Sequence, residues 1–355
     1  MTTENWTERT VISNGQRIHM RIAGETGPLV LLCHGFPESW YSWRHQLKAL
    51  SEAGYRAVAI DMPGYGRSSK PTNPAAYGTV ELVAVCVGVV EALGETTAVI
   101  IGHDLGAPVA WTAAWTRPDI FRAVVGMSVP FGAAGLGCLP GSPFGETRPS
   151  EAAAKLAGPD RMFYHEYFAL HREAAAAEAE PDMRSWLTSA FYSLSGDKPL
   201  PPELAAFDMT KLPDLVLREV VRAAISVPRT SGAGMSGLLE LPATLPDWLR
   251  PEDLDYCVAE LESTGIYHAL GYYMNGDRDW EALGPHQGKP LSVPALYIGG
   301  DRDIVTIWSQ EAIARAEEVV TDLRGKIILP GCGHWIPQEA PEAVNDALLT
   351  FLRSL

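Results

Sequence analysis

Short apolar runs alternate with segments of helical spacing in the first third and the last fifth of the chain. A continuous apolar run that is short and partly β-branched is typical of a buried strand. Such runs lie at residues 28–33, 56–60, 98–101, 123–127, 294–300 and 326–329. Helical spacing is found at residues 40–50, 80–93 and 341–352. Because fully apolar strands that alternate with helices form sheets covered on both faces, we expect an α/β fold with a mostly parallel central sheet.

The start of the chain carries a different pattern. Residues 10–12 and 16–20 have alternating character and flank Ser13-Asn14-Gly15. Asn-Gly between two such segments favours a tight hairpin turn, because both residues tolerate positive φ. The sequence therefore predicts a β-hairpin ahead of the parallel sheet.

The alternation stops near Pro130. Residues 131–149 are rich in Gly and Pro, as expected of a loop, and the chain from there to Pro290 shows helical patterns and no convincing strand. Two of the helical patterns lie at 172–178 and 254–261. We expect one α/β domain formed by residues 1–130 and 290–355, interrupted by a helical insertion at residues 131–289.

Composition narrows the range of partners. The formal charge is −15 over 355 residues, and no basic run offsets it, which argues against nucleic acid or an anionic membrane surface as a partner. The N-terminus is polar and no apolar run is long enough to span a membrane. Five cysteines are scattered without a Cys-x-x-Cys pair. These features predict a cytoplasmic protein with reduced thiols.

No cofactor motif is present in the sequence. The Gly-rich loops lack the spacing of a nucleotide-binding loop, and no His-Glu-x-x-His or similar ligand spacing occurs. We therefore expect neither a metal nor an organic cofactor.

The stretch Gly102-His103-Asp104-Leu105-Gly106 joins an apolar run to a segment of helical character. A sharp turn from strand to helix needs residues without side chains on either side of its apex, so this spacing has the form of a nucleophile elbow with Asp104 at the apex. A Gly-Asp turn that merely caps a helix is the structural alternative. His103 is expected to have a positional role.

Polar residues follow several of the predicted strands. His34, Asp104, Asp303 and His334 each lie in a loop just after an apolar run. Reactive groups of a doubly wound sheet gather at the carboxyl ends of its strands. The order nucleophile, acid, histidine is that of an α/β-hydrolase, whereas each residue taken alone has a structural explanation.

Four motifs resemble those of soluble epoxide hydrolases of the α/β-hydrolase superfamily. They are the run His34-Gly35-Phe36-Pro37 with its continuation to Arg44, the Asp104 elbow, the Gly-Asp-Arg-Asp loop that ends at Asp303, and Cys332-Gly333-His334-Trp335. The resemblance extends over nearly the whole chain, and it implies that the helical insertion is a lid over the site.

The resemblance implies a covalent mechanism. Asp104 is ionised at neutral pH and can attack an epoxide carbon without a base, leaving an ester. His334 is then the general base that activates water, and Asp303 orients its ring. The backbone N–H groups of Phe36 and Leu105 are expected to bind the oxyanion. Candidate substrate-binding residues from the same motifs are His34, Pro37, Trp40 and Trp335, although His34 is expected to brace loops.

An epoxide oxygen needs a proton donor as the ring opens, and the family supplies two lid tyrosines for it. A phenol holds its proton at neutral pH and can give it to an alkoxide. The family's patterns match Tyr164 and Tyr273, with Tyr167 and Tyr272 as the neighbours that could be confused with them.

Two other functions remain open. A dehalogenase could use the same nucleophile, but Leu105 stands where haloalkane dehalogenases carry an indole that holds the halide. A non-catalytic protein that binds a small molecule is the second alternative, since fold alone does not imply function. The expected partner is a small-molecule epoxide; a homodimer is compatible with the sequence, which does not fix the oligomeric state.

Overall fold

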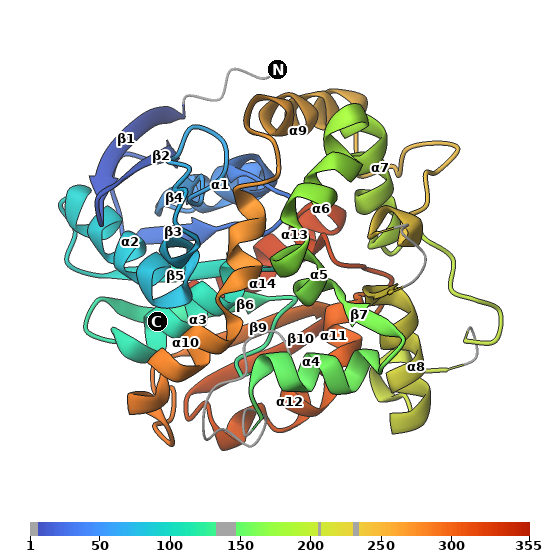
Figure 1. The fold of residues 1–355 in the computed structure, drawn as a ribbon. Coiled ribbons are helices and arrows are strands. Elements are labelled where there is room, and N and C mark those ends of the chain that lie inside the picture. The colour runs from blue at the N-terminus through green and yellow to red at the C-terminus, as the bar shows by residue number, and fades with distance from the viewer. Residues whose placement is uncertain (1–5, 133–146, 205–206, 230–233) are drawn as a thin grey trace.

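The computed structural model describes residues 6–132, 147–204, 207–229 and 234–355. Eight strands form one sheet in the order β1-β2-β4-β3-β5-β6-β9-β10 (Figure 1). The first two strands pair antiparallel, β2 pairs antiparallel with β4, and all other neighbours are parallel. The strands are β1 (Thr7–Ser13), β2 (Gln16–Ala23), β3 (Leu29–Cys33), β4 (Arg56–Ile60), β5 (Ala98–His103), β6 (Phe121–Met127), β9 (Ala295–Gly300) and β10 (Leu323–Leu329). The prediction of a mostly parallel α/β sheet is confirmed.

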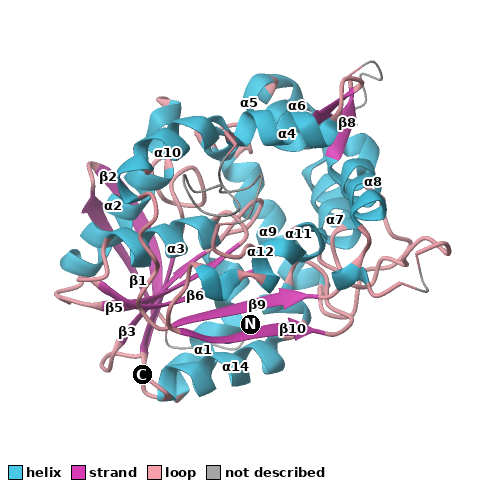
Figure 2. Cartoon of the chain, turned by 90° about the horizontal axis from the view of Figure 1, so that it is seen from below, coloured by secondary structure: helices cyan, strands magenta, loops and turns pink. Residues whose placement is uncertain are grey.

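Helices cover both faces of the sheet (Figure 2). Successive side chains of a strand point to opposite faces, so Leu31 of β3 packs in one apolar cluster and Leu32 in the other. The cluster around Leu31 includes α2 (Thr79–Ala92) and α3 (Gly106–Thr116), whereas the cluster around Leu32 includes α1 (Arg44–Glu52) and α14 (Pro341–Arg353). The fully apolar strands are explained by this burial on both sides.

The hairpin is formed as expected. β1 and β2 pair in a register that ends at Ser13 and Gln16, and the turn between them has φ of 46° at Asn14 and 72° at Gly15. Both residue types tolerate this left-handed conformation, which fits the twist of the flanking strands.

The chain between β6 and β9 consists mainly of helices. Residues of α6, α7 and α9 belong to the same apolar cluster as α2 and α3. The helices are α4 (Pro149–Ala157), α5 (Tyr164–Leu170), α6 (Arg172–Ala179), α7 (Met183–Ser193), α8 (Asp214–Ile225), α9 (Pro251–Thr264) and α10 (Gly276–Ala282), together with the 3-10 helix η6 (Ala269–Met274). Within the described ranges, no helix is both long and apolar enough to cross a membrane.

One expectation for this part of the chain was wrong. We expected no strand here, yet β7 (Arg161–Phe163) and β8 (Ser226–Pro228) pair antiparallel as a two-stranded ribbon. Each strand has only three residues, which is too short for an alternating pattern to be recognised in the sequence. Most of the loop predicted at 131–149 lies outside the described residues.

The last helices follow the carboxyl ends of β9 and β10. They are α11 (Ile304–Trp308) and α12 (Gln310–Ala314) after β9, and α13 (Ile336–Glu339) before α14. The loops that precede α11 and α13 contain Asp303 and His334, so both residues lie at the same edge of the sheet as Asp104.

Candidate active site

Asp104 lies at the apex of the turn from β5 to α3. Its φ is 50°, a left-handed conformation that is uncommon for a residue with a side chain. The flanking glycines are sterically required: a Cβ on Gly102 would lie 2.1 Å from the carbonyl oxygen of Gly106, and one on Gly106 would lie 2.1 Å from that of Cys33. The strained turn therefore directs the carboxylate away from the backbone, at the end of the sheet.

The two oxygens of the Asp104 carboxylate face different groups. The backbone N–H of Phe36 donates to Oδ1 over 2.8 Å, whereas His334 Nε2 lies 3.3 Å from Oδ2. Gly35 permits this approach, because a Cβ there would lie 2.2 Å from Oδ1. The side chain of Asp104 is only 12% exposed, so few water molecules compete for these contacts.

Asp303 holds the other side of the His334 ring. Asp303 is fully buried, and its Oδ1 lies 3.0 Å from His334 Nδ1. The same oxygen accepts the Val305 N–H over 3.0 Å, so Asp303 also caps α11. Asp303 is therefore both the N-cap of α11 and the hydrogen-bonding partner of His334.

The two carboxylates change the proton affinity of the imidazole. Burial disfavours the charged form of His334, but Asp303 and Asp104 more than offset it and hold its pKa well above the usual range. Burial likewise opposes ionisation of Asp303, yet His334 and the hydrogen bonds to its oxygens lower its pKa. The titrations of His334 and Asp303 are therefore coupled to each other.

Ser128 also contacts this pair, and the sequence did not single it out. Its hydroxyl lies 2.5 Å from Asp303 Oδ2 and 3.0 Å from His334 Nδ1. A single serine carries no motif; the available signal was its position directly after β6, at the edge of the sheet where the other site residues gather.

Beside Asp104 lies a cavity of about 180 Å³. Its wall is mainly apolar and comes from the sheet edge and from the helices between β6 and β9. The lining residues are Phe36, Pro37, Asp104, Tyr164, Phe168, Trp186, Ala190, Ser193, Leu194, Lys198, Ala224, Ile225, Met235, Leu238, Leu239, Tyr273, Arg302, Ile304, Val305 and His334. Such a cavity, with a few polar groups converging in an apolar wall, suits a small organic molecule.

The two predicted tyrosines lie in this cavity wall. Tyr164 begins α5 and Tyr273 belongs to η6, and their ring centroids are 5.8 Å apart. Burial, followed by the negative charge of Asp104, raises the pKa of both phenols well above the usual range. Both groups are therefore protonated at neutral pH and can donate a hydrogen bond.

The neighbouring tyrosines have other partners. The hydroxyl of Tyr272 donates to the Pro63 carbonyl over 2.9 Å, and that of Tyr167 donates to Glu178. Neither residue is among the described residues that line the cavity. Tyr164 and Tyr273 therefore differ from their neighbours in that they line the cavity.

Of the four predicted substrate-binding residues, only Pro37 is among the described residues that line the cavity. His34 accepts the Met62 N–H at Nε2 over 3.0 Å and its Nδ1 lies 2.8 Å from the Gly35 carbonyl. His34 therefore connects two loops, as expected. Trp40 and Trp335 are not among the described residues that line the cavity.

Both tryptophans are held elsewhere by their indole N–H groups. Trp40 donates to the hydroxyl of Tyr256 over 3.0 Å, and Trp335 donates to the Phe191 carbonyl over 2.9 Å. Trp335 nevertheless packs on the ring of His334, with centroids 4.7 Å apart. Leu105 is also outside the cavity lining and packs partly buried against the core.

His103, next to the apex, is buried beneath the site. Its Nδ1 lies 2.8 Å from Glu38 Oε2, and its Nε2 lies 2.8 Å from the backbone carbonyl of His334. Burial opposes ionisation of Glu38, but His103 and further contacts bring its pKa down to about 2. The contact between the His103 ring and the His334 carbonyl thus connects the loop that carries His334 to the elbow.

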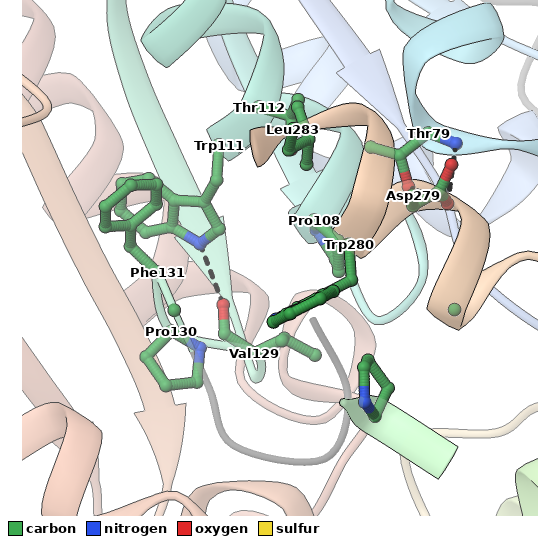
Figure 3. A pocket seen from close by; sticks show the side chains of 13 residues that line it. Thr79, Pro108, Trp111, Thr112, Val129, Pro130, Phe131, Asp279, Trp280 and Leu283 are labelled. Carbon is green, nitrogen blue, oxygen red and sulfur yellow. Dashed lines mark hydrogen bonds between the residues drawn. The ribbon is translucent and has the colours of Figure 1, made fainter. Parts of the chain in front are cut away.

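A second, smaller cavity of about 60 Å³ lies between α3 and α10 (Figure 3). Two of its polar side chains are bonded within the protein: Trp111 donates to the Val129 carbonyl over 2.9 Å, and Asp279 Oδ2 accepts the N–H and hydroxyl of Thr79, each over 2.9 Å. Burial raises the pKa of Asp279 to about 6. These bonded groups, among the described residues of the wall, do not converge on a ligand.

Metal-binding side chains do not gather elsewhere in the described parts of the chain. No group of three or more His, Cys, Asp or Glu residues within them is arranged to hold an ion. The candidate site is therefore the cavity beside Asp104.

Comparison with known proteins points to one family. A family model described as the alpha/beta hydrolase fold matches residues 28–179. Over 351 residues the chain is 47% identical to epoxide hydrolase B of Mycobacterium tuberculosis, with 98% of each chain covered, and over 359 residues it is 36% identical to epoxide hydrolase A of the same species, again with 98% of each covered. The solved structure of an epoxide hydrolase from an endophytic Streptomyces matches with a TM-score of 0.85 at 42% identity, covering 99% of this chain and 96% of that one.

Proposed function

The chain belongs to the epoxide hydrolase family of α/β-hydrolases, and we propose that it adds water to an epoxide to give a vicinal diol through an ester on Asp104. One observation carries this proposal. The Asp104 carboxylate is held between the Phe36 N–H and His334, in a cavity that Tyr164 and Tyr273 also line.

In the first half-reaction, Asp104 attacks an epoxide carbon and the carbon–oxygen bond of the ring breaks. Oδ1 is held by the Phe36 N–H, so Oδ2 is the oxygen that forms the new bond and Oδ1 becomes the ester carbonyl oxygen. The ring oxygen takes a proton from Tyr164 or Tyr273 as it becomes a hydroxyl. Their elevated pKa supports this role, because the phenols remain protonated until a strongly basic alkoxide forms.

In the second half-reaction, His334 takes a proton from water at Nε2 and the resulting hydroxide attacks the ester carbonyl carbon. Negative charge then develops on Oδ1, where the Phe36 N–H already points; the family resemblance adds the Leu105 N–H. The ester bond breaks, and His334 passes its proton to the departing oxygen. The carboxylic acid left on Asp104 then gives its proton to solvent and the tyrosinate takes one from solvent, so both groups return to their starting state and the net reaction is epoxide plus water to diol.

The helical segment supplies the parts of the site that recognise an epoxide. Tyr164 and Tyr273 come from it, as does much of the apolar cavity wall. We therefore assign residues 131–289 to a lid and residues 1–130 and 290–355 to the catalytic domain. The apolar lining favours an epoxide with hydrocarbon substituents.

The alternatives are less well supported. Halide release requires a group that holds the halide, and Leu105, at the position of the indole in haloalkane dehalogenases, packs against the core. A protein that only binds small molecules would not need a carboxylate, an imidazole and a second carboxylate in hydrogen-bonded sequence. A cytoplasmic location is proposed on the free thiols of Cys33, Cys86, Cys257 and Cys332.

The direct test is to trap the ester. The His334→Gln variant is incubated with aromatic, aliphatic and lipid epoxides, and the peptide that contains Asp104 is analysed by mass spectrometry. A mass increase equal to that of the epoxide is expected. The wild-type protein, given the same epoxides and a set of haloalkanes, should form diols and release no halide; halide release without diol formation would favour the dehalogenase.

A further inference from the structure

Ser128 lies between the two groups that the proposed mechanism uses to activate water. It directly follows β6 and is fully buried. Its Oγ is 2.5 Å from Asp303 Oδ2 and 3.0 Å from His334 Nδ1. The other oxygen of Asp303, Oδ1, lies 3.0 Å from the same ring nitrogen. Three side chains therefore close a ring of hydrogen bonds on the side of the imidazole that faces away from Asp104.

The chemistry of these groups fixes where the protons are. An ionised carboxylate only accepts hydrogen bonds, so the Ser128 hydroxyl donates to Asp303 Oδ2. Nδ1 of His334 faces the carboxylate oxygen Oδ1 and the remaining lone pairs of Ser128 Oγ, and it must therefore carry a proton. With Nδ1 protonated, Nε2 is the nitrogen that accepts a proton from water.

The backbone of Ser128 is held in a conformation that a serine rarely adopts. Its φ is 68°, and among the described non-glycine residues only Asn14 and Asp104 share a positive φ. The Ser128 N–H donates to the Ile298 carbonyl, and the Ser128 carbonyl accepts the hydroxyl of Tyr297, each over 2.9 Å. Such strain persists only where the surroundings impose it, and it often accompanies a functional site.

The hydroxyl of Thr306 provides a comparison for that of Ser128. It helps to distinguish support of Asp303 alone from support of Asp303 and His334 together. Thr306 Oγ1 also lies within hydrogen-bonding distance of Asp303 Oδ2, at 3.1 Å, but it has no contact with His334 among those observed. Loss of the Thr306 hydroxyl would therefore weaken the support of Asp303 and remove a contact of 3.0 Å with the Tyr297 hydroxyl, but it would leave the Ser128 hydroxyl beside Nδ1 of His334. Loss of the Ser128 hydroxyl would remove the support of Asp303 and the second acceptor for Nδ1–H together.

We propose that Ser128 is a positioning residue that ties Asp303 and His334 into one unit and fixes the His334 ring for the hydrolysis of the ester. This inference rests on the proposed function. It deepens that function by assigning Ser128 to the second half-reaction alone, because Ser128 does not line the cavity and the attack by Asp104 needs no base.

The test compares Ser128→Gly, Ser128→Ala and Thr306→Val with the wild-type protein. Glycine accepts the positive φ and alanine does not, so the two Ser128 variants differ in backbone strain while both lack the hydroxyl. Formation and loss of the ester on the Asp104 peptide are followed by rapid quenching and mass spectrometry, and thermal unfolding reports stability separately.

Both Ser128 variants should hydrolyse the ester about tenfold more slowly than the wild type, the effect expected for one hydrogen bond to a charged group, while ester formation stays within about twofold. The ester should then accumulate during turnover, and KM should fall with kcat. Thr306→Val should slow hydrolysis less than either Ser128 variant does.

Three results would overturn the assignment: ester hydrolysis unchanged in both Ser128 variants, an equal loss in both half-reactions, or a Thr306→Val defect as large as that of Ser128→Gly. These outcomes are distinct from failure of the proposed function. If the proposed function were wrong, no ester would form on Asp104 in the His334→Gln protein with any of the epoxides. The role assigned to Ser128 would then be wrong as well.

Discussion

His334 Nε2 lies 3.3 Å from Asp104 Oδ2, so the proposed base and the proposed nucleophile face each other. The negative charge of Asp104 helps to keep the pKa of His334 high. Formation of an ester removes that charge. In the proposed mechanism the imidazole then gives up its proton more readily, so a larger fraction of His334 is neutral and able to accept a proton from water at the step that needs a base.

This relationship predicts the behaviour of Asp104→Asn. Burial, which lowers the pKa of His334, is retained, while one of the two carboxylates that raise it is lost, so the pKa should fall. NMR titration of the His334 ring protons measures it. Asp119→Asn, at an exposed site paired with Arg117, is the matched control and should leave that titration unchanged. An unaltered His334 pKa in Asp104→Asn would show that the two groups are not coupled.

Removal of the cavity phenols should slow epoxide opening. Tyr164→Phe and Tyr273→Phe should each lower the rate of ester formation by roughly 10-fold or more, and the double variant by at least about 100-fold, because no proton donor to the alkoxide remains. Tyr167→Phe and Tyr272→Phe are matched controls, since their hydroxyls bond to Glu178 and to the Pro63 carbonyl. Stopped-flow or rapid-quench measurement of ester formation distinguishes the pairs. Equal losses in both pairs would contradict the assignment.

Gly35 is required for the approach of Phe36 to Asp104. A Cβ at Gly35 would overlap Asp104 Oδ1, at 2.2 Å, so Gly35→Ala must displace the carboxylate, the loop or both. Because small displacements of a reacting group are costly, we expect kcat/KM for diol formation to fall by about 100-fold or more. Gly284→Ala meets nothing within 4 Å and should retain wild-type activity. Near-normal activity of Gly35→Ala would show that the Phe36 donor is dispensable.

The sequence predicted the sheet well because its strands are buried on both faces. The strand predicted at 56–60 matches β4, and that at 294–300 differs from β9 by one residue. Residues whose roles follow from their position after such strands, among them Asp104, Asp303 and His334, are brought together in the structure. Continuous apolar runs and motifs of fixed spacing can be recognised in a sequence without any knowledge of tertiary contacts.

Features that depend on tertiary contacts were not predictable. Trp40 was selected from its motif, but its indole N–H bonds to Tyr256, which lies in α9, far along the chain. Ser128 acquires its contacts only when β6 pairs with β9 and the loop after β10 brings His334 within hydrogen-bonding distance. A single serine next to a strand has many structural explanations, and only the distances to Asp303 and His334 distinguish this one.

Asp61 is a buried carboxylate outside the candidate site, and its contacts stabilise the fold. It is fully buried; its Oδ1 accepts the Trp40 N–H over 3.2 Å, and its Oδ2 accepts the Arg67 N–H over 3.1 Å and lies 2.7 Å from His19 Nδ1. These contacts join β2, the loop after β3 and the turn after β4. Burial opposes its ionisation, but the contacts with His19 and the further hydrogen bonds lower its pKa below the ordinary value of 3.8.

Asp61→Asn should therefore lower the free energy of unfolding at neutral pH by about 3 kcal/mol, because hydrogen bonds to a charged acceptor are lost and their buried donors are left without an equivalent partner. Because the folded-state pKa is depressed, the stabilisation is present above the unfolded pKa and is lost as the pH falls through the folded value. The difference between wild type and variant should thus shrink as the pH is lowered from about 5 toward 2. Urea unfolding across this range measures it, with Asp119→Asn, whose partner Arg117 is also exposed, expected to change stability by less than about 1 kcal/mol. A difference that stays constant with pH would mean that the charge of Asp61 contributes nothing and that only the shape of its side chain matters.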